Sequence, residues 1–304
     1  MSSSTAGLFL VDRSHVLEQI FFKASISIIL AYILQNSLQT VSILIVGRSS
    51  FEALSVAAFS YMSAMATAWL IGMGGTTGID TLASPSFTGS NDKHDLGIIL
   101  QRAPSISTLF YLPIIILWIF AEPVLRGLKF LTVLIPGGFG YIFFKCMKNY
   151  LQAQGTLRPG TYVLLITSPI NACLNFLFSY TFKIGLLGTP ITTGISYWLS
   201  FLRTVDGWLV RNAGVVSTVV TSRILASSLE SQIWLWYMPG LSVVAVVAGQ
   251  PGAVPLVGQS IIMTADQVMD TIPFGVSATT SARVDNLLGA RDGKGAAGAA
   301  NTAA

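Results

Sequence analysis

Long uncharged, apolar runs alternate with short segments that hold the charged residues, and this alternation is the dominant pattern of the chain. Lys23 and Arg48 enclose the first such run, residues 24–47. Comparable runs follow at 53–79, 103–121, 160–182 and 184–202. About 20 apolar residues suffice for an α-helix to cross a bilayer. A helix also satisfies its own backbone hydrogen bonds in lipid. The pattern therefore predicts membrane-spanning helices.

Two further regions predict the remaining spans. The uncharged run 130–144 is short for a crossing, so we expect its helix to continue past Lys145, with that ammonium group snorkelling toward the interface. Residues 231–282 contain only two charged side chains, Asp266 and Asp270. This stretch is too long for one crossing and suits two, with a turn at residues 250–252. The fold class is therefore an all-α integral membrane protein with about eight transmembrane helices.

Composition and motifs narrow the class of function. Charged residues make up 10% of the chain and apolar types 52%, against about 25% charged in soluble domains, and the mean hydropathy is +0.68. Cys146 and Cys173 are too few for a disulfide framework or a four-cysteine zinc site. Phosphate-binding loops and hydrolase motifs are missing from the sequence. We therefore expect no ATP-driven pump, no enzyme, no cofactor, no metal and no nucleic-acid partner.

Basic residues predict the orientation, because they concentrate on the cytoplasmic side of membrane proteins. An even number of crossings places both termini on one side. With the N-terminus inside, the following basic residues are cytoplasmic: Arg13, Lys23, Lys93, Arg102, Lys145, Lys148, Arg158, Arg203, Arg211, Arg223, Arg283, Arg291 and Lys294. Only Arg48, Arg126, Lys129 and Lys183 fall outside. The N-terminus is therefore expected in the cytoplasm, in a plasma or vacuolar membrane protein.

An internal repeat indicates how the spans are grouped. A shift of 200 residues places Gly75 on Gly275, Gly89 on Gly289 and Asp92 on Asp292, six spans apart. Parallel repeats of this kind occur in transporters that rock two helix bundles around a central site. We expect a complete first bundle, two helices of a second one and a flexible tail. The predicted parts are a cytoplasmic segment 1–22, a six-helix lobe 23–203, a cytoplasmic linker 204–230 and a partial second lobe 231–304.

Several segments resemble the multidrug and toxin extrusion (MATE) family, specifically its eukaryotic, fungal-like branch. They are GIDTLASPSFTG at 78–89, GIILQRA at 97–103, YLQAQG at 150–155, ITSPINACLN at 166–175 and the long segment 255–291. Their order is that of the family. The resemblance implies a two-lobed, twelve-helix exporter that exchanges protons or sodium for bulky, often cationic, organic compounds by alternating access. A monomer that binds small organic substrates within the bilayer is expected.

The chain departs from the family pattern at several places. The helices after the eighth are missing, the connection 122–135 is short, and the stretch 239–248 skips a segment that carries a glutamate in the family. Pro85 stands where glutamine is usual, and Asp285 where glycine is usual. The alternative hypothesis is therefore a non-transporting, truncated remnant of such a transporter.

Acidic residues in the predicted spans are the first candidates for function. A carboxylate at the bilayer centre costs about 2.5–3.5 kcal/mol on insertion scales and usually faces a cavity. Asp266 and Asp270 lie one turn apart and share a helix face with Gln259. We expect them to couple transport to protons; the alternative is a structural hydrogen bond between helices. Asp80 closes the second span. Two roles are considered for it, proton coupling and capping of a helix N-terminus.

Polar stripes mark the second group of candidates. Gln35, Gln39 and Ser42 form one stripe on the first span. Asn171 and Asn175, with neighbouring serines, form another on the fifth. Such stripes must face protein or water, so we expect the two stripes and Asp266 to line a common cavity. The alternative is hydrogen bonding from helix to helix, worth about 0.6 kcal/mol per bond.

Overall fold

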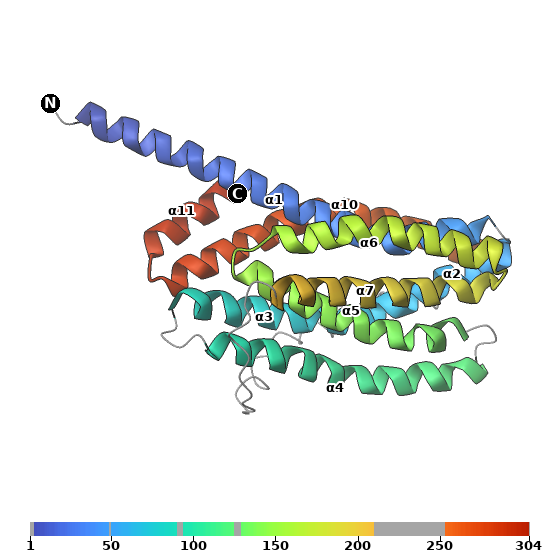
Figure 1. The fold of residues 1–304 in the computed structure, drawn as a ribbon. Coiled ribbons are helices and arrows are strands. Elements are labelled where there is room, and N and C mark those ends of the chain that lie inside the picture. Colours follow the sequence, from blue (N-terminus) through green and yellow to red (C-terminus); the bar gives the residue numbers. More distant parts are fainter. Residues whose placement is uncertain (1–2, 49, 90–93, 125–128, 210–252, 304) are drawn as a thin grey trace.

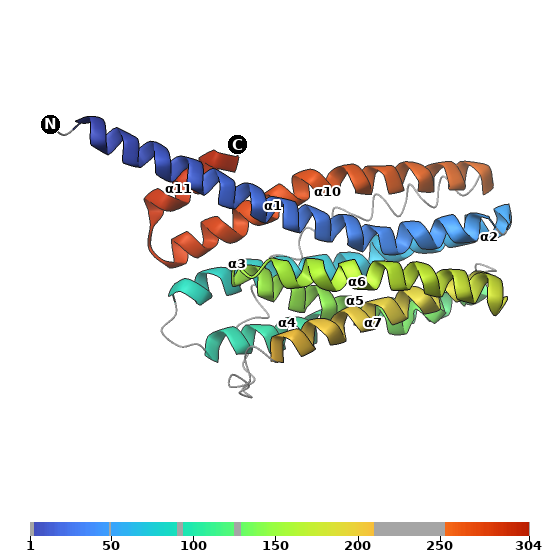
Figure 2. The ribbon, with the colours of Figure 1, turned by 45° about the horizontal axis from the view of Figure 1, so that its top comes forward.

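The computed structural model describes residues 3–48, 50–89, 94–124, 129–209 and 253–303. In these ranges the chain is helical and contains no strand. Figures 1 and 2 show long helices that run side by side in one bundle, with the start of α1 projecting beyond it. The predicted seventh span and the turn at 250–252 lie outside the described residues, as does most of the predicted linker.

The helices follow the predicted spans closely. α1 (Ser3–Gly47) is followed by α2 (Phe51–Ala64), η1 (Met65–Trp69) and α3 (Leu70–Gly89), which together form one long helix. α4 (His94–Val124), α5 (Lys129–Ala153) and α6 (Arg158–Phe176) come next. After them come η2 (Leu177–Thr181), η3 (Gly185–Leu187), α7 (Gly188–Leu209), α10 (Ala253–Gly289) and α11 (Gly293–Ala303). α1 begins well inside the segment 1–22, which is continuous with the first span.

Five stretches of the described chain are long and apolar enough to cross a membrane. They are Phe21–Gly47, Phe51–Gly89, Leu96–Phe120, Lys129–Ala153 and Arg158–Thr181. α7 and α10, which correspond to the predicted sixth and eighth spans, are long enough but are not among these five stretches. α4 leaves large apolar side chains exposed, among them Leu109, Ile116 and Phe120. Large exposed apolar patches are rare on soluble proteins, so this outward apolar face suits lipid.

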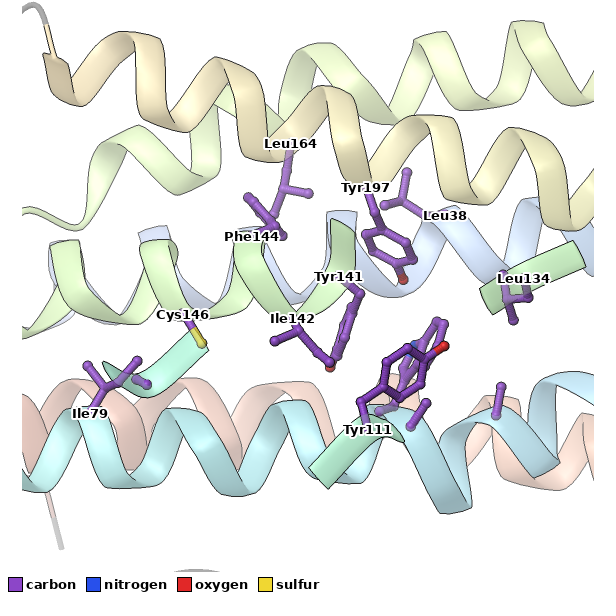
Figure 3. Packing of buried hydrophobic residues seen from close by; sticks show 14 of the residues in the cluster. Leu38, Ile79, Tyr111, Leu134, Tyr141, Ile142, Phe144, Cys146, Leu164 and Tyr197 are labelled. Carbon is purple, nitrogen blue, oxygen red and sulfur yellow. The ribbon is translucent and has the colours of Figure 1, made fainter. Parts of the chain in front are cut away.

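Packing partners define the architecture. α5 packs against α3, α4 and α7, and α6 packs against α1 and α7. α10 packs against α1, α2 and α3. It runs along the top of the bundle in Figure 2. The interior is rich in aromatic rings: Trp69 stacks on Tyr141 with 4.7 Å between centroids, and Tyr197 meets both rings edge-on. Figure 3 shows Tyr141 and Tyr197 side by side in this core.

Two predictions were wrong, one about Lys145 and one about the C-terminal tail. Lys145 does not snorkel: its side chain is only 3% exposed, inside the bundle. The tail after Arg291 was expected to lack structure, yet it forms α11, packed against α10. The carboxylate of Asp292 accepts a hydrogen bond from the Gly295 amide at 2.9 Å, which caps the helix N-terminus. Ala296 and Ala299 are buried, so small side chains allow the close packing that the composition alone did not reveal.

Candidate functional site

The interior of the bundle holds two groups of polar side chains. The first, here called the amide network, joins α1, α6 and α7 through Ser42, Asn171, Asn175, Thr192 and Ser196. All five are completely buried. Asn175 donates to the Ser42 hydroxyl at 3.0 Å and accepts from Thr192 at 2.8 Å. Asn171 accepts from Ser196 at 3.0 Å and donates to the Leu38 carbonyl at 2.9 Å.

The amide network is internally satisfied. Asn175 also donates to the Asn171 side-chain oxygen at 3.1 Å, so the nitrogen and oxygen atoms of both amides have partners within the chain. Thr193 extends the network to the Tyr61 hydroxyl, 2.8 Å away. Gln39 donates to the Tyr197 hydroxyl at 3.4 Å. In this conformation the amides connect helices to one another, which is the hydrogen-bonding alternative considered for the two stripes.

The second group, here called the charged cluster, lies between α1, α3 and α5 and consists of Asp80, Lys145 and Lys148. Lys148 is 1% exposed and donates to the Gln35 side-chain oxygen at 3.0 Å. Both ammonium groups lie over the Tyr32 ring, at 4.0 Å for Lys148 and 4.8 Å for Lys145. Such cation–π contacts stabilise a desolvated cation by about 2 kcal/mol. The cluster therefore places two lysine side chains inside an apolar bundle.

Asp80 faces the same region from α3. Its carboxylate accepts a hydrogen bond from the Asn149 side-chain amide at 3.0 Å. Because Asp80 lies well within α3, the capping role considered for it does not occur. The half-buried Asp80 thus lies beside two buried lysines, and burying a charged group is costly unless it has partners. The partners supplied here are an amide, a glutamine oxygen and an aromatic ring.

Lys145, Lys148 and Asn149 were not predicted as site residues, and the two lysines were expected among the cytoplasmic basic residues. Their spacing of i, i+3 and i+4 places them on one face of α5, and charged residues inside a spanning helix generally face the bundle interior. That signal was present, but Lys145 was interpreted as the end of an uncharged run. Gln35 was expected to line a cavity and instead accepts from Lys148.

Asp266 and Asp270 lie in a different setting from the buried groups. Both are exposed on α10, and Gln259 on the same face is half-buried. The opposite face of α10 packs on the bundle, where Asn36 of α1 donates to the Gln267 carbonyl at 3.3 Å and to the Thr271 hydroxyl at 3.2 Å. The structure therefore places the predicted residues in three settings: the amide network, the charged cluster and the exposed face of α10.

A groove of about 600 Å³ lies between α5 and α7. Its lining includes Pro136, Ile191, Trp198 and Leu202, and none of the polar cluster residues. Within the described ranges, no three histidine, cysteine or acidic side chains converge as a metal site would require. The polar and ionisable candidate residues of the described chain therefore lie inside the helix bundle and on α10, and not in this groove.

Long apolar helices with apolar side chains facing outward define an integral membrane protein. The MatE family model matches residues 27–177. An uncharacterized transporter of Schizosaccharomyces pombe is 29% identical over 283 residues, covering 86% of this chain and 53% of that protein. Protein DETOXIFICATION 16 of Arabidopsis thaliana is 26% identical, covering 93% of this chain and 63% of that protein.

Solved structures show the same fold. The crystal structure of the eukaryotic MATE transporter AtDTX14 superposes with a TM-score of 0.78 at 22% identity, covering 96% of this chain and 69% of that one. The chain belongs to the MATE family, as its motifs predicted. It spans about half the length of the curated relatives it matches.

Proposed function

We propose that this protein exports organic compounds, many of them cationic, in exchange for protons by alternating access. Its setting would be the plasma or vacuolar membrane, as a monomer with a cytoplasmic N-terminus. One relative of the chain is named multidrug and toxin extrusion protein 2, from Oryctolagus cuniculus, at 27% identity over 73% of this chain. A MATE fold supports a role in solute export. The buried polar residues support the coupling of that export to the movement of protons.

The observation that carries the proposal is the charged cluster. Two lysines, 3% and 1% exposed, lie inside the bundle, and the half-buried Asp80 lies beside them. Inserting a single charge at the centre of a membrane helix costs about 2.5–3.5 kcal/mol, and ionisable groups buried in spanning helices mark ion or substrate pathways. Helix packing alone needs no buried ions, because apolar side chains of similar size generally stabilise at least as well. Asp80, with Asp266 and Asp270 on α10, supplies carboxylates that can exchange protons.

A reconstituted transport assay tests the proposal. The purified chain in proteoliposomes loaded with ethidium should release the dye when the opposite compartment is acidified, and a protonophore should abolish the release. Dye release that is equal without a pH gradient, or equal in protein-free liposomes, would contradict it. Release driven only by a sodium gradient would show that the exchanged ion is sodium and not the proton.

A variant connects the assay to the charged cluster. Lys148→Met keeps an unbranched side chain, one atom shorter, and removes the donor to Gln35. We expect gradient-driven release to fall about tenfold, because a charge-assisted hydrogen bond contributes about 1.5–3 kcal/mol. Lys294→Met, exposed on α11, is the matched control and should keep the rate. Equal rates in both variants would exclude Lys148 from the pathway.

A further inference from the structure

The last turns of α3 and α10 make backbone contact. A Cβ placed on Gly89 would lie 2.7 Å from the carbonyl oxygen of Gly289. A Cβ placed on Gly289 would lie 2.6 Å from the carbonyl oxygen of Pro85. The neighbours are backbone atoms that cannot rotate away, so only glycine permits this approach. Figures 1 and 2 show these two helix ends beside one another, at the end of the bundle that carries α11.

Hydrogen bonds reinforce the same contact and join a third helix. The Thr88 hydroxyl donates to the Asn286 carbonyl at 2.7 Å, from α3 to α10. The Asn286 side chain donates to the Ala153 carbonyl at 3.1 Å, from α10 to the last residue of α5. Ala153 would otherwise be one of the unsatisfied carbonyls at a helix C-terminus. The ends of α3, α5 and α10 are therefore held together by direct bonds.

The two glycines are also related by the internal repeat. The shift of 200 residues that aligns the end of the second span with the end of the eighth places Gly89 on Gly289. Equivalent positions of two repeats contact each other only where the pseudo-twofold axis passes between them. In transporters built from parallel repeats, one half rocks against the other around a central site. A contact on the axis at one end of the helices closes that end.

We propose that Thr88, Gly89, Ala153, Asn286 and Gly289 form a latch that holds this end of the bundle shut, and that the transport cycle must open it. The inference rests on the proposed function, since it assigns the gate of the alternating-access cycle. The structure represents the shut state. Weakening the latch should shift the population toward a state open at this end, because a two-state equilibrium responds to any change that favours one state.

Cysteine labelling measures this shift without any transport. Thr279 lies on the buried face of α10, seven residues before Asn286, and Thr279→Cys places a reporter thiol there. Cys173→Ser removes the exposed native cysteine, and the buried Cys146 gives the baseline in the parent without the reporter. The full chain in nanodiscs is then treated with a membrane-impermeant maleimide. When opening is fast, the labelling rate follows the open population.

The two latch variants are expected to raise the labelling rate by different factors. Gly89→Ala should raise the labelling rate at least about tenfold, because the added methyl group overpacks backbone atoms. Thr88→Val removes one hydrogen bond at nearly constant volume and should raise the rate about fivefold. Gly258→Ala is the matched control on α10, since a Cβ there meets nothing within 4 Å; its rate should stay at the parental value.

The possible outcomes distinguish a specific effect on the latch from misfolding, and the latch proposal from the transport proposal. Samples are compared at equal folded fraction, judged by a single size-exclusion peak and the melting temperature. If Gly89→Ala does not fold, Thr88→Val decides the question. Parental labelling rates in Thr88→Val, or an equal rise in Gly258→Ala, would overturn the latch. Raised labelling in a protein that moves no ethidium would leave the latch standing and refute the transport proposal alone.

Discussion

Asp80 on α3 and Asn149 on α5 are joined by a 3.0 Å hydrogen bond from the amide to the carboxylate. The bond connects two helices that also pack along their length. Asn149 therefore supplies a direct side-chain donor to the Asp80 carboxylate.

Replacing Asn149 by leucine should therefore destabilise the bundle. The substitution keeps the number and branching of the side-chain heavy atoms but leaves the half-buried Asp80 carboxylate without this donor, and an unsatisfied buried group costs about 1–3 kcal/mol. The melting temperature in detergent should fall clearly. Asn301→Leu, on the exposed face of α11, should change stability by less than about 0.5 kcal/mol. Equal melting temperatures in the two variants would show that the Asp80–Asn149 bond contributes nothing.

The amide network can be tested by a double-mutant cycle. Asn175→Ala and Thr192→Val each remove one partner of the 2.8 Å bond between α6 and α7. The coupling free energy should be about 0.6 kcal/mol, the average for hydrogen bonds between membrane helices. The control cycle pairs Asn175→Ala with Thr204→Val, whose hydroxyl bonds within its own helix. That coupling should be near zero, and a coupling as large as the first would indicate a global change.

Asp266 is the carboxylate for which a coupling role was predicted from the sequence. If it exchanges protons on the exposed face of α10, Asp266→Asn should lower gradient-driven ethidium release by about tenfold or more, because amides do not titrate at physiological pH. Asp206→Asn near the end of α7, also exposed, is the control and should retain the rate. Unchanged release in Asp266→Asn at equal reconstituted amount would exclude it as the coupling group.

Close packing of α5 on α7 should depend on Gly137. A Cβ at this position would lie 2.7 Å from the Gly194 Cα, so Gly137→Ala should force the two helices apart. Overpacking of this kind costs about 1–3 kcal/mol, measurable as a lower melting temperature. Gly97→Ala on α4, where a Cβ meets nothing within 4 Å, should leave stability unchanged or raise it. A drop of equal size in both would show that the loss does not come from the contact between Gly137 and Gly194.

The sequence by itself determined the class of protein. Long uncharged runs can only be buried in lipid as helices that satisfy their own hydrogen bonds, so the spans around residues 24–47, 53–79, 103–121 and 160–182 were predictable from length and hydropathy. The family was readable from its motifs, because their order along the chain survives at low identity. α11 was not predictable, since its stability comes from small side chains packed on α10 and not from an apolar face.

Only the tertiary structure decided which polar residues meet. The periodicity placed Asn171 and Asn175 on one face of a helix, but their partners Ser42, Thr192 and Ser196 come from two other helices. Lys148 meets Gln35 across 113 positions of sequence, and the crossing of α1 and α5 brings them together. Rotation and crossing of helices depend on packing between whole side chains. That information is spread over the chain, so a polar stripe predicts an inward face without naming what it contacts there.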